Sequence, residues 1–370
     1  MAVIRRLVAL PLIAALGMGF ASGTNPLEAD QWGLGHVGFP EAWDSSTGED
    51  VVVAVVDTGV DLEHPDLQGQ LVEGYDFVDP GTPPDDPNGH GTHVAGIIAA
   101  ADDDIGTVGS AYGAKVMPVR VLDAEGLGES EAISDGIVWA AENGADVINL
   151  SLGDEGFGSR ISKGGVINSA ILEANELGAV VVAAFGNEGK LGLSYRIGVD
   201  VIVVGAIDQD NQVASFSNVG DVRAVMAPGV EILSTVPEEP TTIFPEGTNG
   251  YAELDGTSMA SPFVAGQAAL LVAQGRDRDE VVDAIDLTAE NPTGGIEYGL
   301  GVVDAAGSVE YSFAGDPEAG EDEGGWPAEI VIVIAAVTAL VLISALIAAT
   351  SRRRSRGRPS ESSPKQRVSV

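Results

Sequence analysis

The sequence predicts an α/β fold in which helices cover both faces of a mostly parallel central sheet. Two observations support this prediction: apolar runs of strand length recur along the chain, and segments with helical spacing lie between them. A parallel strand that is buried on both faces has no polar side, so it reads as a continuous apolar run. Alternation of such runs with helices is typical of βαβ units.

Five runs rich in β-branched residues predict the strands of this sheet. In chain order they are Asp50–Asp57, Ala114–Asp123, Ala145–Gly153, Ala179–Asn187 and Asp200–Asp208. Two segments with apolar residues at helical spacing predict helices over Ser130–Gly144 and Gly164–Gly178, and both end at glycine, which commonly terminates a helix. Two further helices, rich in small residues, are expected after His90 and after Ser258.

The composition allows a large folded domain and excludes several kinds of site. The 370 residues are 45% apolar, and the absence of cysteine excludes disulfides, zinc–thiolate sites and a cysteine nucleophile. The formal net charge of −38 repels phosphate groups, so no nucleic-acid partner is expected. The acidic surface is interpreted as a source of solubility, with adaptation to high salt or to abundant divalent cations as alternatives.

Both ends of the chain predict membrane targeting. Residues 1–22 have a basic start and an apolar centre, as in a secretory signal peptide, although a first membrane anchor is an alternative. Residues 329–350 are predicted to form a transmembrane helix, because the uncharged run Ile330–Ala349 is about 30 Å long as a helix. The arginine-rich residues 351–370 then form a cytoplasmic tail by the positive-inside rule.

These segments predict a single-pass type I protein of the cell membrane. Residues 314–328 are acidic and rich in Gly and Pro, and they are interpreted as a solvated linker. One domain, residues 23–313, then lies outside the cytoplasm.

Three polar residues that a core does not need end a predicted strand or precede a predicted helix. Asp57 ends the first strand in VVDTGVD, His90 lies in NGHGTHVAG, and Ser258 lies in GTSMASP. Each alone has a structural explanation as a turn cap, a hydrogen-bonded loop histidine or a helix N-cap. Together they are the groups that nucleophilic catalysis by serine requires: a nucleophile, a base, and a carboxylate that orients the base. Asn187, in FGNEG, adds an amide that can donate to an oxyanion.

In order and context these motifs, with SLG at Ser151–Gly153, resemble the subtilisin-like serine peptidases, or subtilases. The resemblance extends from about Gln31 to Val309, and the order Asp, His, Ser is that of subtilisin. It implies a subtilisin-like three-layer fold and a serine endopeptidase that forms an acyl-enzyme.

The resemblance also implies a role for each residue. Ser258 is expected to be the nucleophile, His90 the general base and Asp57 the carboxylate that orients His90, while the Asn187 amide and the Ser258 backbone N–H form the oxyanion hole. Thr257 and Ser261 are then residues of the helix start. A peptide substrate is expected to lie extended between two segments, Gly126, Leu127, Gly128 on one side and Ser151, Leu152, Gly153 on the other. Ala184 and Phe185 are expected to approach the primary specificity pocket. Phe185 stands where the family has a small residue, so it is expected to reshape that pocket.

A structural Ca²⁺ is the one cofactor that the resemblance suggests. Asp66 and Asp103 match positions at which subtilases hold this ion, and hard oxygen ligands suit it. A solvated acidic turn at Ala101–Gly109 is the alternative.

The architecture further resembles the mycosins, membrane-anchored subtilases of a secretion system, so secretion-system partners are a hypothesis. A scaffold that uses a subtilase fold without required proteolysis is the main alternative function. An esterase is disfavoured, because no GxSxG motif surrounds Ser258.

Overall fold

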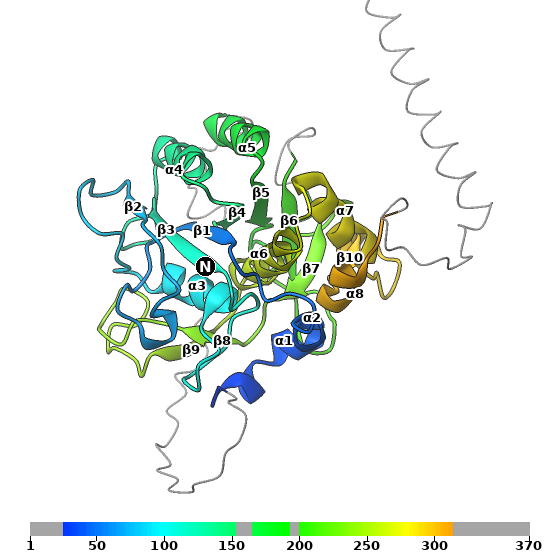
Figure 1. The fold of residues 1–370 in the computed structure, drawn as a ribbon, viewed down its shortest axis with the longest axis horizontal. Coiled ribbons are helices and arrows are strands. Elements are labelled where there is room, and N and C mark those ends of the chain that lie inside the picture. Colours follow the sequence, from blue (N-terminus) through cyan, green and yellow to red (C-terminus); the bar gives the residue numbers. More distant parts are fainter. Residues whose placement is uncertain (1–24, 153–164, 193–199, 314–370) are drawn as a thin grey trace, which may run out of the picture. The chain divides into compact units, whose positions relative to one another are not determined.

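The apolar runs form the centre of an eight-stranded sheet in a computed structural model that describes residues 25–152, 165–192 and 200–313 (Figure 1). The described helices and strands belong to one unit that ends at Tyr311. In spatial order the sheet runs β10-β7-β6-β5-β4-β1-β3-β2, and each of these pairings is parallel. Its strands are β1 Val52–Asp57, β2 Tyr75–Asp76, β3 Lys115–Arg120, β4 Val147–Leu150, β5 Val180–Ala184, β6 Ile202–Ile207, β7 Val225–Pro228 and β10 Gly301–Val302.

The five predicted strands correspond to β1, β3, β4, β5 and β6, so the parallel α/β prediction is confirmed. The sequence did not reveal β2 and β10, which have two residues each, or β7, which has four. It also missed the antiparallel pair β8 Ile232–Thr235 and β9 Tyr251–Leu254. Runs this short are too brief to show a periodicity.

Helices cover both faces of the sheet. On one face α4 Ser130–Glu142 and α5 Val166–Glu176 lie side by side, and their apolar residues share a core cluster with β1, β3, β4 and β5 (Figure 1). On the other face α3 His90–Ala99 contacts β1, and α6 Thr257–Ala273 crosses β4, β5, β6 and β7. Both helices predicted by spacing are therefore confirmed as α4 and α5.

Helix α6 is buried along almost its whole length, from Thr257 to Leu271. Such a helix needs apolar or small residues on every side, which explains its composition. Shorter helices complete the domain: α1 Trp32–His36, α2 Phe39–Ala42, α7 Arg278–Thr288 and α8 Ala305–Glu310, with 3₁₀ turns at Glu28–Asp30, Pro65–Leu67 and Ile296–Tyr298.

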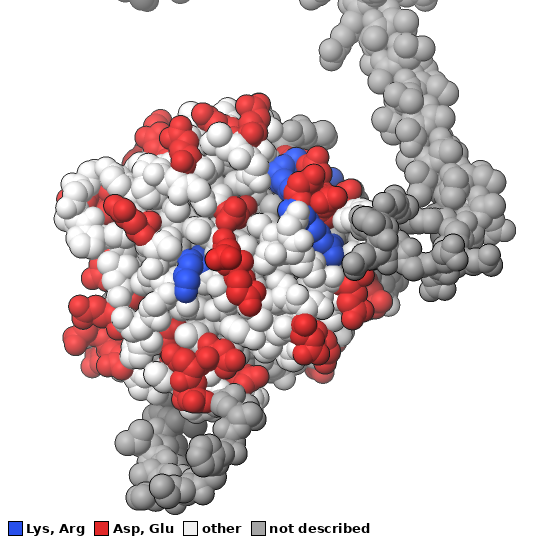
Figure 2. Space-filling model, viewed as in Figure 1, with Lys and Arg blue, Asp and Glu red and all other residues white. Residues whose placement is uncertain are grey.

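Acidic side chains are spread over the visible face of the domain, whereas basic ones occupy a few small areas, some beside α7 (Figure 2). In the part of the chain that the structure describes, no helix is long and apolar enough to cross a membrane. The predicted signal peptide, linker, transmembrane helix and tail (1–22, 314–328, 329–350 and 351–370) lie outside the described residues, as does Gly153.

Candidate active site

The carboxyl end of β1 holds a buried carboxylate. Asp57 is fully buried, and its Oδ1 accepts hydrogen bonds from the Thr58 backbone N–H at 2.7 Å and from His90 Nδ1 at 2.8 Å. Since Nδ1 donates to the carboxylate, neutral His90 keeps its lone pair on Nε2. Asp57 therefore selects the tautomer of His90 in which Nε2 can act as a base.

His90 opens helix α3 directly after Gly89, whose φ of 104° lies in the left-handed region that favours glycine. The next residue, Gly91, packs so closely on the turn after β1 that an added Cβ would lie 2.0 Å from the Gly59 carbonyl oxygen. Glycine on both sides of His90 thus lets the helix start approach Asp57 closely.

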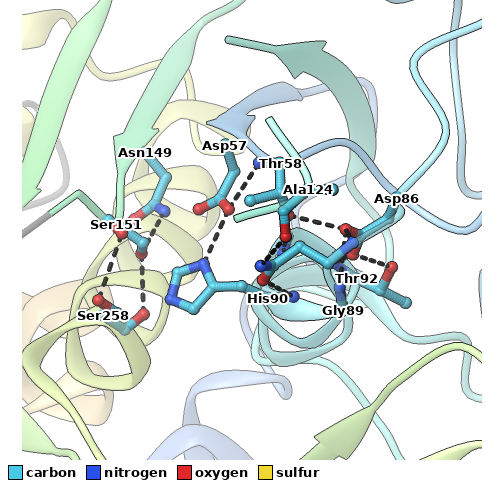
Figure 3. A network of polar contacts seen from close by, with 12 residues as sticks. Asp57, Thr58, Asp86, Gly89, His90, Thr92, Ala124, Asn149, Ser151 and Ser258 are labelled. Atoms are coloured by element: carbon cyan, nitrogen blue, oxygen red, sulfur yellow. Dashed lines mark hydrogen bonds and ion pairs between the residues drawn. The ribbon is translucent and has the colours of Figure 1, made fainter. Parts of the chain in front are cut away.

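A second buried carboxylate, Asp86, holds the loop that leads into α3. It accepts hydrogen bonds from the hydroxyls of Thr58 and Thr92 at 2.8 and 2.6 Å, and from the backbone N–H groups of Asn88, Gly89 and Thr92 (Figure 3). Burial raises the pKa of Asp86, and these hydrogen bonds act against that rise. Sequence reasoning missed Asp86, because an acidic residue in an acidic loop has no distinguishing pattern.

The charge environment raises the pKa of His90 above its ordinary value. Burial by itself lowers this pKa, but the charge and hydrogen bond of Asp57, together with the charge of Asp86, outweigh burial. The imidazolium form of His90 is consequently stabilised.

Ser258 lies in the first turn of α6, and the second ring nitrogen of His90 faces it (Figure 3). Its hydroxyl donates to the Ser151 carbonyl at 3.3 Å, and within the described residues no hydrogen bond joins it to His90. A long or absent serine–histidine bond is common in a site without substrate. Asp57, His90 and Ser258 are thus brought together as the sequence led us to expect.

Asn187 lies beyond the end of β5, against the start of α6. Its Oδ1 accepts from the Thr257 backbone N–H at 2.9 Å and from the Thr257 hydroxyl at 3.0 Å, while that hydroxyl accepts from the Gly186 N–H. With Oδ1 fixed in this way, the Nδ2 end of the amide is turned away from Thr257 and makes no hydrogen bond within the described residues. Thr257 is therefore more than the helix-start residue that the sequence suggested, since it orients the amide of Asn187.

The segments expected to hold substrate flank this site. Gly126–Gly128 follows β3 in a loop where the Asp123 N–H donates to the Leu127 carbonyl, and Leu127 is half exposed. Ser151 and Leu152 continue β4 and are buried. Their neighbour Gly153 lies outside the described residues, so the structure describes the pocket only in part.

Ala184 ends β5 and is buried, as is Phe185. The Phe185 side chain packs in a small apolar cluster with Val203 and Ala224. The domain interior thus accommodates the side chain of Phe185, which is larger than the residue that the family has at this position.

Hydrogen-bond donors surround Asp66, the expected metal ligand. Asp66 is fully buried; its Oδ1 accepts from the Tyr251 hydroxyl at 2.8 Å, and its Oδ2 accepts from the Thr107 N–H at 2.8 Å. Burial raises the pKa of this carboxyl group, although these bonds act against the rise. At Gly106, an added Cβ would lie 2.4 Å from Asp66 Oδ2, so the loop approaches the carboxylate as only glycine allows.

Asp103, the second expected ligand, is exposed in the same loop, where its Oδ1 accepts from the Ile105 N–H. The carbonyls of Ala101 and Thr107 converge on the side-chain amide of Asn25. Within the described ranges no group of three or more His, Cys, Asp or Glu side chains is close enough to hold a metal ion, so any such site must rely on carbonyl and amide oxygens.

Comparison with known proteins identifies relatives of this chain. The profile of the subtilase family matches residues 48–299. The thermophilic serine proteinase of a Bacillus species is 44% identical over 279 residues, which cover 73% of this chain and 64% of that protein. Thermitase of Thermoactinomyces vulgaris is 42% identical over 284 residues, 76% of this chain and 96% of thermitase. Among solved structures, a protease of Pseudoalteromonas arctica superposes with a TM-score of 0.69 at 34% identity, covering 78% of this chain and 99% of that one.

Proposed function

This chain belongs to the subtilase family of serine endopeptidases, and we propose that it hydrolyses peptide bonds through Asp57, His90 and Ser258. The observation that carries the proposal is the 2.8 Å bond from His90 Nδ1 to Asp57, with the other ring nitrogen facing Ser258 (Figure 3). This arrangement leaves a basic nitrogen directed at a hydroxyl in the first turn of a helix.

In the proposed reaction, His90 Nε2 takes the proton of Ser258 as Oγ attacks the substrate carbonyl carbon. The Asn187 amide and the Ser258 backbone N–H donate to the oxyanion that forms. His90 then gives its proton to the leaving amine, and an acyl group remains on Ser258. Water then attacks the acyl carbonyl carbon as His90 takes its proton, and His90 gives that proton to Ser258 Oγ as the acid product leaves. Asp57 stabilises the imidazolium in both halves of the reaction.

A serine-directed fluorophosphonate probe tests this function on the full-length chain. We expect labelling of the wild type, none in Ser258→Ala, and a strong reduction in His90→Ala. A melting curve of each variant shows that it is folded. Equal labelling in Ser258→Ala contradicts the assigned nucleophile, and a folded wild type that is not labelled favours the scaffold function.

For the substrate, we propose a peptide that lies extended between Gly126–Gly128 and Ser151–Gly153. The half-exposed Leu127 supports a contact with apolar substrate side chains. Leu127→Glu should raise KM for an apolar peptide and leave hydrolysis of a small ester unchanged. An equal loss with both substrates would place Leu127 outside the peptide site.

We further propose that a structural Ca²⁺ is held by Asp66, Asp103 and the carbonyls of this loop. The support is that the carbonyl oxygens of Ala101 and Thr107 point to one place in the loop, and that Gly106 approaches the Asp66 carboxylate closely. Calcium should raise Tm in the wild type and much less in Asp66→Ala. A Tm that chelation leaves unchanged in the wild type would reject the site.

The full chain is proposed to be a type I membrane protein with the protease domain outside the cytoplasm, and this rests on the sequence of its ends. Because the chain has no cysteine, Ser312→Cys and Ser355→Cys each introduce a single thiol. An impermeant maleimide should label the first in intact cells and the second only after lysis. The reverse pattern would overturn the orientation. Crosslinking in the same cells would test for secretion-system partners.

A further inference from the structure

A polar residue with no evident structural reason lies in the middle of apolar strand β4. Asn149 is fully buried, between Ile148 and Leu150, which pack into the core under α4 and α5. Because side chains alternate along a strand, Asn149 points to the opposite face, where α6 crosses the sheet. Burial of an amide costs free energy unless its hydrogen bonds are made, so its partners define its role.

Asn149 links two serines that lie on different elements. Its Oδ1 accepts from the Ser261 hydroxyl at 2.8 Å, and its Nδ2 donates to the Ser151 hydroxyl at 2.8 Å. Ser151 Oγ in turn lies 2.8 Å from the Ser258 carbonyl oxygen (Figure 3). Since Ser151 Oγ accepts from the amide, its single proton is directed to the carbonyl of Ser258.

The Ser258 carbonyl has lost its usual partner. In an α-helix this oxygen would accept from the N–H four residues later, but that residue is Pro262, which has no N–H. The bond from Ser151 supplies the donor that the proline removes. In the reverse direction the Ser258 hydroxyl donates to the Ser151 carbonyl at 3.3 Å, so the two residues are joined by two bonds.

We infer that Asn149 is a positioning residue for Ser258, acting through the Ser151 hydroxyl, which replaces the helix bond that Pro262 cannot make. This inference rests on the proposed function of Ser258 as nucleophile. It assigns the amide two tasks, to direct the proton of Ser151 and, through Ser261, to hold the first turns of α6 against β4. The bond to the Ser258 carbonyl thereby fixes the backbone of Ser258 relative to Ser151. The directions of Ser258 Oγ and of its backbone N–H are fixed with it.

The inference predicts a loss of turnover that a second substitution cancels. Ser151→Ala removes the donor, and kcat on a chromogenic peptide should fall about threefold to tenfold, as for loss of one hydrogen bond, with KM nearly unchanged. Pro262→Ala restores an N–H opposite the Ser258 carbonyl. In that background, Ser151→Ala should change kcat by less than about twofold, because the helix itself now supplies the bond.

A matched control separates positioning from stability. The Ser46 hydroxyl donates at 2.8 Å to the Leu270 carbonyl near the other end of the same helix. Ser46→Ala should lower Tm about as much as Ser151→Ala does, with kcat unchanged. Asn149→Ala should lower kcat at least as much as Ser151→Ala, and the rate of fluorophosphonate labelling should fall in parallel.

The inference is overturned if Ser151→Ala loses as much kcat in the Pro262→Ala background as in the wild type. It is also overturned if Asn149→Ala and Ser151→Ala lower Tm but leave kcat and the labelling rate intact. Should Asn149→Ala fail to fold, the Ser151 and Pro262 cycle decides alone. A wild type that is not labelled at Ser258 would instead refute the proposed function, so the two failures are distinguishable.

Discussion

The role of Thr257 gives the sharpest functional prediction. Its hydroxyl and its backbone N–H both donate to Asn187 Oδ1, so removal of the hydroxyl leaves one of two bonds that orient the amide. Thr257→Val keeps the approximate shape but loses that bond, which is worth about 0.5–1.5 kcal/mol. If the whole of this energy is lost from the transition state, kcat falls about twofold to twelvefold. The buried Gly186 N–H also loses its acceptor, so Tm should fall as well.

The assay is steady-state hydrolysis of a chromogenic peptide by four proteins: wild type, Thr257→Val, Asn187→Ala and the double variant. Asn187→Ala should reduce kcat by about 10²–10³, the cost known for the corresponding donor in subtilisin. Because Thr257 acts through Asn187, the double variant should match Asn187→Ala within about twofold. Thr257→Ser, which keeps the hydroxyl, is the matched control and should remain near wild type.

A double variant in which both losses multiply in full would refute this reasoning, since it would mean that Thr257 acts independently of the amide. A change in KM alone would refute it too, because an oxyanion donor acts in the transition state.

Two further predictions concern carboxylates: the buried Asp86 and the partly buried Asp286 of α7. Asp86→Asn removes a charge that raises the pKa of His90, so the acid limb of kcat/KM should move to lower pH; an unmoved limb would exclude electrostatic coupling. Tm should also fall in this variant. The hydrogen-bond partners of Asp86 are all donors, and the NH₂ group of an asparagine at this position cannot accept their hydrogen bonds. Burial, followed by the charge of Asp283, raises the pKa of Asp286 to about 7, so its ionisation opposes folding as pH rises from about 4 to about 7. In a Ser258→Ala background, Asp286→Asn should therefore raise Tm at pH 8 and not at pH 4; an equal gain at both pH values would contradict this linkage.

Much of the fold follows from the sequence, because a parallel strand buried on both faces leaves a continuous apolar run. The runs that became β1, β4 and β5 also predicted that Asp57 and Asn187 lie where the parallel strands have their carboxyl ends. What the sequence could not reveal depends on contacts between distant segments. Asp86 contacts Thr58, 28 residues away, and Ser151 contacts Ser258, 107 residues away.

Some residues were identified without their full role. Asn149 was part of a predicted strand, and its amide gave no local signal, because its link to α6 is made to Ser261, 112 residues away. Phe185 was expected from its size to reshape the substrate pocket; the structure packs its side chain with Val203 and Ala224, and it describes the pocket itself only in part. Side-chain direction in both cases depends on strand alternation and on which layer covers each face, and neither can be read from one segment.

The three hydroxyls at the start of α6 illustrate how helical geometry separates residues of the same type. Thr257 and Ser261 are four residues apart, so they share one face of the helix, and that face lies against β4 and β5. There the Thr257 hydroxyl donates a hydrogen bond to Asn187, and the Ser261 hydroxyl donates one to Asn149. Ser258 is rotated by about 100° from Thr257, which turns it toward His90 at the start of α3. All three are buried, so a cap exposed to solvent is not their purpose. A helix packed between a sheet and another helix must satisfy each hydroxyl with a different neighbour, and the same spacing that hides Thr257 and Ser261 in the sheet leaves Ser258 as the one that can reach a base.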